Sequence, residues 1–285
     1  MRLAYNPPPM PHPLITSPTL PALDNGAMLL AFSGWMDGGE VSTGTVKNLL
    51  RHLQATKIAA IDPDPFYIYN FPGSMEVSAL FRPNVKYKKG VTVEFDFPTN
   101  AFFCSSDHNL ILFTGKEPNL RWREFGDSVF TLAKATGVRR IYFVGSFGGT
   151  VPHTREPRLF ASVSDKKLRP KLRKYGVKFT DYEGPASFSS YLLNRAGEHD
   201  LQMINFAAEI PAYIDGVNPL SIESVTRRLA SILELPVDLS PMRVESDEWT
   251  AQVTTMLKDD KKLAGHVRKL EDAYDTEMLE NAEDD

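Results

Sequence analysis

The sequence predicts a three-layer α/β/α domain with a helical extension at its C-terminal end. Two observations support this fold class. Short apolar runs alternate with amphipathic helical patterns between residues 26 and 240, and glycine-containing turns follow two of these runs. Strands that alternate with helices form a sheet that is covered on both faces. The chain has 285 residues, of which 42% are hydrophobic, so it is long enough to bury a sizeable core.

The apolar runs give the predicted strands. In chain order these are residues 27–32, 57–61, 91–97, 109–114, 141–144, 158–164, 177–182 and 201–208. The run at 27–32 is continuously apolar, as in a strand that is buried on both faces. The run at 91–97 instead alternates apolar and polar residues, which predicts a strand with one buried face.

Apolar residues at helical spacing predict four helices between these strands. The residues that define them are Val46, Leu49 and Leu53, then Phe125, Val129 and Leu132, then Phe188, Leu192 and Ala196, and finally Val225, Leu229 and Leu233. A basic, helix-like piece at 166–174 separates two of the later strands. No glycine- or serine-rich linker divides 26–240, so we expect one domain there.

The N-terminal segment, residues 1–25, has a different composition. Seven of the 21 prolines lie in its first 21 residues. Proline fixes φ and lacks an amide donor, so this segment cannot form a helix or an inner strand. We predict an extended N-terminal arm that lies on the domain or is disordered. The alternative is a polyproline II segment that a partner or a neighbouring subunit binds.

Residues 241–285 contain six basic and thirteen acidic residues. Apolar residues from Val253 to Tyr274 fall near helical spacing, which predicts a helical extension that packs on the domain or on another subunit. From Glu271 onward the charged residues are all acidic, and this predicts a frayed, solvated tail.

Composition excludes several classes of protein. A net charge of -4 makes a nucleic-acid-coating protein a poor fit, because such binding needs many cations. Cys104 is the single cysteine, so no internal disulfide can form, and we expect a cytoplasmic location and a buried, inert thiol. No run of about 20 apolar residues predicts a membrane span. The six histidines are scattered, so we expect no metal and no cofactor.

Two glycine turns at predicted strand ends are candidates for anion binding. The first, 34–39, precedes a helix, where free amides and the helix dipole favour an anion. Gly38 and Gly39 would let a ligand approach the backbone closely. The turn matches neither a dinucleotide-binding fingerprint nor a Walker A loop. The alternative is a tight strand-to-helix turn in which Asp37 caps the helix.

The second turn, 145–149, leads to His153 and Arg155. These two side chains could hold a carboxylate or a phosphate. The alternative is that Arg155 pairs with a structural carboxylate while His153 packs locally.

Several separated motifs carry a family resemblance. They are residues 34–39, 81–83, 115–118, 152–155, 182–189, 210–213, 218–219, 236–239 and 267–271. In their order and spacing the sequence resembles the proteasome assembly chaperone 2 family, in its branch of bacterial proteins of unassigned function. The resemblance extends from about residue 25 to about residue 272. It implies a phosphorylase/hydrolase-like α/β/α fold with a helical C-terminal addition, and self-association, with a trimer as one form.

The resemblance and the lack of a catalytic constellation favour a non-catalytic, self-associating interaction or assembly protein of chaperone-like type. In this role, the proline-rich arm or the acidic tail would engage a protein partner. Catalysis is left open, although we assign no catalytic residue.

The alternative function is an enzyme or sensor for a small anionic ligand that contains a nucleoside, phosphate or carboxylate group. Its binding residues would converge at the carboxyl ends of the strands. They are Asp37, Gly38, Gly39, Arg82, Glu117, His153, Arg155 and Glu209. Asp37 or Glu209 would act as general base, and His153 or Arg155 would hold the anion.

Overall fold

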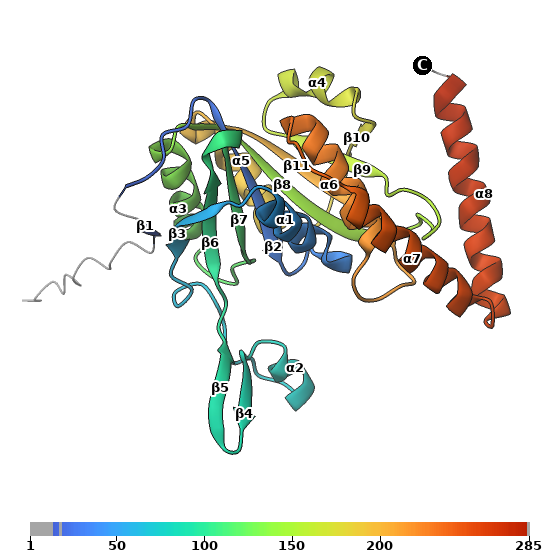
Figure 1. The fold of residues 1–285 in the computed structure, drawn as a ribbon, viewed down its shortest axis with the longest axis horizontal. Coiled ribbons are helices and arrows are strands. Elements are labelled where there is room, and N and C mark those ends of the chain that lie inside the picture. Colours follow the sequence, from blue (N-terminus) through green and yellow to red (C-terminus); the bar gives the residue numbers. More distant parts are fainter. Residues whose placement is uncertain (1–13, 17–18, 284–285) are drawn as a thin grey trace, which may run out of the picture.

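A computed structural model describes residues 14–16 and 19–283. Nine strands form one mixed sheet in the order β1-β3-β6-β7-β2-β8-β11-β9-β10. The strands are β1 (Leu14–Thr16), β2 (Gly26–Ser33), β3 (Thr56–Ile61), β6 (Asn100–Ser105), β7 (Leu110–Lys116), β8 (Val138–Gly149), β9 (Leu159–Val163), β10 (Val177–Phe179) and β11 (Gln202–Pro211). Figure 1 shows this sheet with helices packed against it.

The four central strands, β7, β2, β8 and β11, are mutually parallel. Their carboxyl ends therefore meet at one edge of the sheet, and this edge holds both glycine turns. β2 is almost completely buried, as its continuous apolar run predicts.

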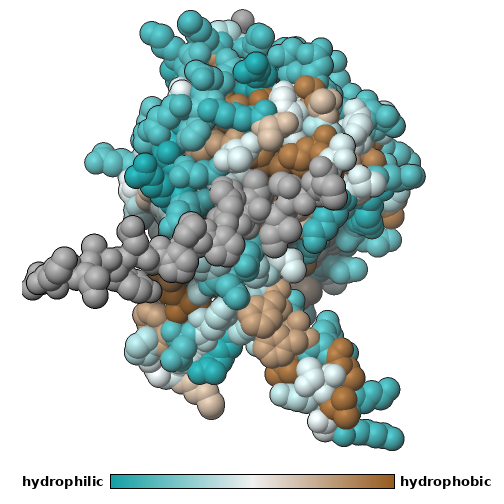
Figure 2. Space-filling model, turned by 90° about the vertical axis from the view of Figure 1, so that its left-hand side faces the viewer, coloured by the Kyte–Doolittle hydropathy of each residue, from teal (hydrophilic) through white to brown (hydrophobic). Residues whose placement is uncertain are grey.

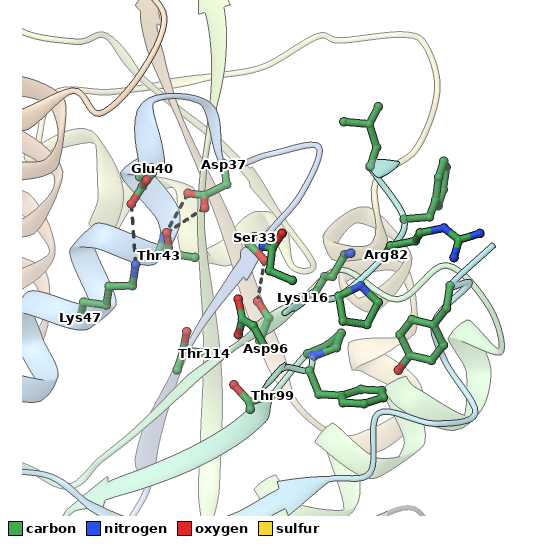
Figure 3. A pocket seen from close by; sticks show the side chains of 18 residues that line it. Ser33, Asp37, Glu40, Thr43, Lys47, Arg82, Asp96, Thr99, Thr114 and Lys116 are labelled. Carbon is green, nitrogen blue, oxygen red and sulfur yellow. Dashed lines mark hydrogen bonds and ion pairs between the residues drawn. The ribbon is translucent and has the colours of Figure 1, made fainter. Parts of the chain in front are cut away.

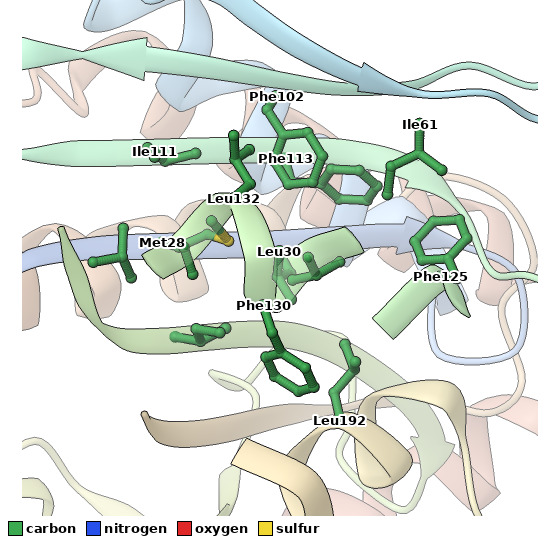
Figure 4. Close-up of a cluster of buried hydrophobic side chains, with 14 of the residues drawn as sticks. Met28, Leu30, Ile61, Phe102, Ile111, Phe113, Phe125, Phe130, Leu132 and Leu192 are labelled. Carbon is green, nitrogen blue, oxygen red and sulfur yellow. The ribbon is translucent and has the colours of Figure 1, made fainter. Parts of the chain in front are cut away.

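Helices cover both faces of the sheet. On one face, α3 (Trp122–Ala135) and α5 (Phe188–Arg195) enclose a cluster that includes Leu30, Phe113 and Phe125 (Figure 4). On the other face, α1 (Val41–His52) and α6 (Pro219–Leu233) pack over Leu29 and Phe206. The short α4 (Arg169–Arg173) accounts for the predicted basic piece. The structure thus confirms the predicted three-layer fold.

The predicted C-terminal helical extension is also present. It consists of α7 (Ser240–Leu257), which packs on α6, and α8 (Lys261–Glu283). The prediction of a frayed tail from Glu271 is wrong for the described residues, because α8 continues to Glu283 and its carboxylates contact cations of the domain. Residues 284–285 of that predicted tail lie outside the described residues.

A second departure concerns residues 70–99, which we call the hairpin extension. It contains α2 (Met75–Ala79), β4 (Asn84–Lys88) and β5 (Val91–Asp96), and it projects from the sheet at the bottom of Figure 1. The predicted strand at 91–97 exists as β5, but the prediction that it is half-buried is wrong. Of the described strands, β5 pairs only with β4, and it is exposed along its length. The sequence pattern did not reveal β6, which pairs with β3 and β7 in the main sheet. Cys104 lies on this strand and is buried.

Most of the predicted N-terminal arm lies outside the described residues, which leaves the prediction for 1–13 and 17–18 open. Residues 14–16 form β1, an edge strand that pairs antiparallel with β3. Within the described part of the chain, no helix is both long and apolar enough to cross a membrane.

Candidate functional site

The first glycine turn is built around Asp37, whose carboxylate binds the first turn of α1 although Glu40 is the residue at the N-cap position. The backbone N–H of Thr43 donates to Oδ1 of Asp37 at 3.0 Å, and the Thr43 hydroxyl donates to Oδ2 at 2.8 Å. Burial raises the pKa of Asp37, and the hydrogen bonds from Thr43 oppose that change. The carboxylate therefore serves a free amide of the first helical turn, as the capping alternative expects.

The two glycines of this turn approach other parts of the protein closely. A β-carbon at Gly38 would lie 2.9 Å from Cδ1 of Ile210, and one at Gly39 would lie 2.8 Å from Cβ of Asn218. Gly39 also has a φ of +63°, which disfavours a larger residue. Their carbonyls accept hydrogen bonds from the hydroxyl of Ser146 and the N–H of Asn218. β11 and the start of α6 thus occupy the space that the glycines leave.

Glu117, which follows β7, also uses its carboxylate to bind backbone N–H groups. Its Oε1 accepts from the N–H of Phe188 at 2.8 Å, and its Oε2 accepts from the N–H of Trp35 at 3.2 Å. The side chain joins the turn after β2 to the first turn of α5.

The second predicted turn, 145–149, is the last part of β8, and the chain leaves the sheet only after Gly149. His153 follows and is 2% exposed. Its Nδ1 lies 2.8 Å from the hydroxyl of Tyr213, and its Nε2 lies 3.0 Å from Oγ1 of Thr254 on α7. Burial lowers the pKa of His153, although Glu271 partly opposes this change. His153 is therefore a buried link between the sheet edge and the C-terminal extension.

Arg155 connects the same loop to α8. Its Nε and Nη2 donate to the two carboxylate oxygens of Asp275 at 2.8 and 2.7 Å. A planar guanidinium and a carboxylate fit each other in this two-bond geometry. The alternative stated for Arg155, pairing with a structural carboxylate, is the arrangement that the structure contains.

Glu209 lies on β11 and belongs to a buried charge network. Its Oε2 is 2.9 Å from Nη1 of Arg158, and its Oε1 accepts from the N–H of Thr150 at 2.6 Å. Nη2 of Arg158 continues to Glu277 on α8 at 2.6 Å. Glu277 also contacts Lys178. Glu209 thus helps to attach α8 to the sheet.

Arg82 and Asp37 line one pocket, with a volume of about 640 Å³, between the domain and the base of the hairpin extension. Figure 3 shows Asp37, Glu40 and Lys47 on one side of this space and Arg82 on the other. Both charge signs line the pocket, since its other charged residues are Asp96 and Lys116. It could accept a ligand that carries an anionic and a cationic group.

The eight predicted binding residues therefore separate into two groups. Asp37 and Arg82 share the pocket, whereas the other six make contacts within the chain along the sheet edge. In the described part of the chain, no group of three histidine, cysteine or acidic side chains is placed to hold a metal ion.

Sequence reasoning missed the residues that partner these side chains. They are Thr43, Ser146, Arg158, Tyr213, Asn218, Thr254 and Asp275. Most of them lie far along the chain from the residues they contact, so no local motif predicts these contacts. The one detectable signal was a helix-capping position, because Asn218 precedes Pro219 at a helix start.

A family model described as the PAC2 family matches residues 31–257. The chain belongs to the PAC2 family. A solved structure of a proteasome-assembly chaperone homologue from Mycobacterium tuberculosis is 26% identical to this PAC2 protein, with a TM-score of 0.73. The match covers 85% of this chain and 99% of that chain.

Two further structures share the fold of this PAC2 protein. A Mycobacterium tuberculosis protein of unknown function is 21% identical, with a TM-score of 0.82, and the match covers 99% of this chain and 95% of that one. An archaeal proteasome activator from Pyrococcus furiosus is 17% identical, with a TM-score of 0.63. The match covers 86% of this chain and 98% of that chain. A search of curated proteins gave no match.

Proposed function

We propose that this PAC2 protein is a non-catalytic, self-associating assembly protein of the cytoplasm, and that it engages a protein partner when assembled. The family membership and the likeness to a proteasome-assembly chaperone homologue support an assembly role. The observation that carries the proposal is the hairpin extension, which exposes apolar side chains to solvent.

The hairpin extension holds more than half of the exposed large apolar side chains of the described residues. Met75 is 83% exposed and Phe95 is 53% exposed. Figure 2 shows brown, apolar side chains on the part that projects at the bottom of the molecule. Contiguous apolar surface of this kind is typical of protein interaction sites.

The β4–β5 pair has one apolar and one charged face over part of its length. Val85 lies opposite Phe95, whereas Lys86 lies opposite Glu94. Because a two-stranded hairpin alone is marginally stable in water, contact with another surface would stabilise it. Among the described residues, both strands also have a free edge, which another chain could pair with.

A second copy of this chain is the occupant we assign to the apolar face. The charged residues of the hairpin carry both signs, as Lys86 lies opposite Glu94 and the same two strands also hold Lys88 and Asp96, so two copies need not repel each other. A dimer would bring two hairpin extensions together in one self-complementary interface. The trimer that the family resemblance implies would instead place each hairpin extension on a different surface of the next copy.

The experiment measures the mass of the full chain in solution by analytical ultracentrifugation over a range of concentrations. We expect the wild-type chain to be an oligomer and the Val85→Glu/Phe95→Lys double variant to be a monomer. Met256→Lys is the matched control, because Met256 is 76% exposed on α7, away from the hairpin extension. This control should keep the wild-type mass.

A monomeric wild-type chain would overturn the proposal, as would a double variant that keeps the wild-type mass. Affinity purification from the native cytosol then compares the wild-type oligomer with the monomeric double variant. If proteins co-purify with the oligomer and not with the monomer, the assembly role gains support. If the same proteins are retained by the monomeric variant, self-association is not required for partner binding.

The anionic-ligand alternative now rests on the pocket lined by Asp37 and Arg82. Lys116 and Arg82 supply cations there that could bind a phosphate or carboxylate group, although Asp37, Glu40 and Asp96 line the same pocket. Titration of the wild-type chain and Arg82→Ala with inorganic phosphate, read as a thermal shift, tests it. Stabilisation that is lost in Arg82→Ala would support ligand binding, and no stabilisation of the wild type would oppose it.

A further inference from the structure

We propose that a second pocket, on the α3/α5 face of the sheet, binds a small, neutral, planar molecule. One edge of this molecule would carry a hydrogen-bond donor next to an acceptor, as in nucleobases and aromatic carboxamides. The pocket has a volume of about 450 Å³ and lies over β8, β11 and β9, beside the start of α5. This volume is within the range of about 300 to 1,000 Å³ that is usual for small-molecule sites. The inference does not depend on self-association.

Asn205 on β11 and Ser162 on β9 are the polar side chains that the strands contribute to this pocket. Asn205 is 8% exposed, and its Oδ1 has no hydrogen-bond partner among the described residues. Asn205 lies opposite Phe143 of β8 and opposite Ser162 of β9, and all three line the pocket. Buried polar atoms are nearly always paired, because an unpaired one costs free energy. Oδ1 itself has almost no accessible surface, so the Asn205 amide must turn toward the pocket for a ligand to supply the missing partner.

The walls of the pocket select for a flat and uncharged ligand. Phe147 and Phe160 stand 5.7 Å apart between ring centroids, and Tyr182 and Trp35 also line the space. None of the described side chains that line it is charged. A charged ligand would lose its hydration without gaining a counter-ion, whereas an aromatic ring would gain contacts with these faces.

The chemistry of Asn205 specifies the edge of the ligand. A side-chain amide offers one carbonyl acceptor and one NH₂ donor group side by side. Such an amide can form two parallel hydrogen bonds with a lactam or carboxamide edge, as it does with nucleobases. Ala207, two residues along β11 on the same face, has a small side chain and leaves room above the floor for the ring.

Residues 180–186 form the outer border of the pocket. They are exposed and have no regular secondary structure. The hydroxyl of Tyr182 donates to the carbonyl of Pro185 at 3.2 Å, and its N–H donates to Oγ1 of Thr180 at 3.1 Å. These contacts hold Tyr182 at the entrance. The motif at 182–189, which the proposed assembly role does not use, would thus serve the ligand.

The experiment titrates the full chain with uracil and with nicotinamide, using saturation-transfer NMR for binding and thermal unfolding for stability. We expect at least one probe to bind the wild type. Benzoate has a similar ring with a charged group, and it should bind more weakly than nicotinamide. Asn205→Leu should bind roughly tenfold more weakly or worse, because two hydrogen bonds are lost. Asn194→Leu, which alters an exposed asparagine of α5, should bind as the wild type does.

Thermal unfolding separates a ligand-binding role from a structural one. If the Asn205 amide is reserved for a ligand, Asn205→Leu should keep or raise the melting temperature, since it removes an unpaired buried polar group. Ala207→Leu provides a second, steric test that should also abolish binding. Failure of both probes to bind the wild type overturns the proposal, as does binding that survives in both variants. A marked drop in melting temperature of Asn205→Leu with intact probe binding in Ala207→Leu also overturns it.

Discussion

Two segments, α8 and the hairpin extension, project from the sheet. They differ in whether their side chains find contacts within the chain. α8 returns its carboxylates to cations of the domain, through the pairs Asp275–Arg155 and Glu277–Arg158. The hairpin extension instead exposes apolar side chains to solvent along much of its length. The comparison teaches that an unusual composition does not by itself mark a partner site. The acidic segment pairs within its own chain at Asp275 and Glu277, whereas the apolar segment is exposed in the described structure.

The largest effect is expected from a matched pair of phenylalanines. Phe113→Ala removes a ring that is fully buried in the α3/α5-side core, and it should lower the unfolding free energy by about 3 to 5 kcal/mol. Phe95→Ala removes an exposed ring of β5, and it should change the monomer's stability by less than about 0.5 kcal/mol. Urea unfolding at several protein concentrations measures both, because association would add a concentration-dependent term. Equal losses would show that the hairpin extension is part of the domain's core.

A slightly smaller effect is expected at Arg158, which anchors α8. Arg158→Met leaves Glu209 buried without its cation and removes the Arg158 contact of Glu277, so stability should fall by about 3 kcal/mol. Urea unfolding measures the loss, and Arg139→Ala, at an exposed position of β8, is the control. A change below that of the control would mean that the Arg158 network does not hold α8.

A weak effect is expected at the exposed end of the same attachment. Arg155 and Asp275 are both solvent-accessible, so Arg155→Ala should cost less than about 1 kcal/mol. High salt should reduce this cost, because it screens exposed pairs. If the cost matches that of Arg158→Met, burial is not what distinguishes the two pairs.

The smallest effect concerns pH at the buried His153. Because burial lowers the pKa of His153 below the ordinary histidine value of about 6.5, the unfolded chain binds a proton at a higher pH than the folded chain does. His153 should therefore contribute a loss of stability as pH falls through 6.5, and none above it. His153→Gln should lose less stability than the wild type between about pH 7.5 and about pH 5.5 in parallel denaturation curves. Identical slopes would contradict the assignment of a buried neutral imidazole.

Much of the fold could be predicted because burial leaves a local trace. Continuous apolar runs predicted β2 and β8, and apolar residues at helical spacing predicted α1, α3, α5 and α6. β6 was missed, because its polar ends and small residues gave no clear alternation. For β5, alternation correctly predicted a strand, but it could not say whether the chain itself or another molecule covers the apolar residues.

The candidate site could be predicted only in part for the same reason. Asp37 as a helix cap and Arg155 as the partner of a carboxylate were both foreseen as alternatives, since each follows from local chemistry. Their outcome depended on Thr43 and Asp275, and the latter lies far along the chain. The second pocket had no sequence signal, because Asn205, Ser162 and Phe143 meet only through strand pairing.

The sequence by itself determined the α/β/α fold class, the helical C-terminal extension and the family, because apolar periodicity and local motifs are written along the chain. Only the tertiary structure decided which charges neutralise each other, which apolar surface stays uncovered, and where an asparagine with an unpaired amide oxygen lines a cavity. These outcomes depend on contacts between residues about 50 to 120 positions apart, as in Arg158–Glu209 and Arg155–Asp275. Such long-range contacts form only when the sheet brings distant segments together, so composition could not assign them.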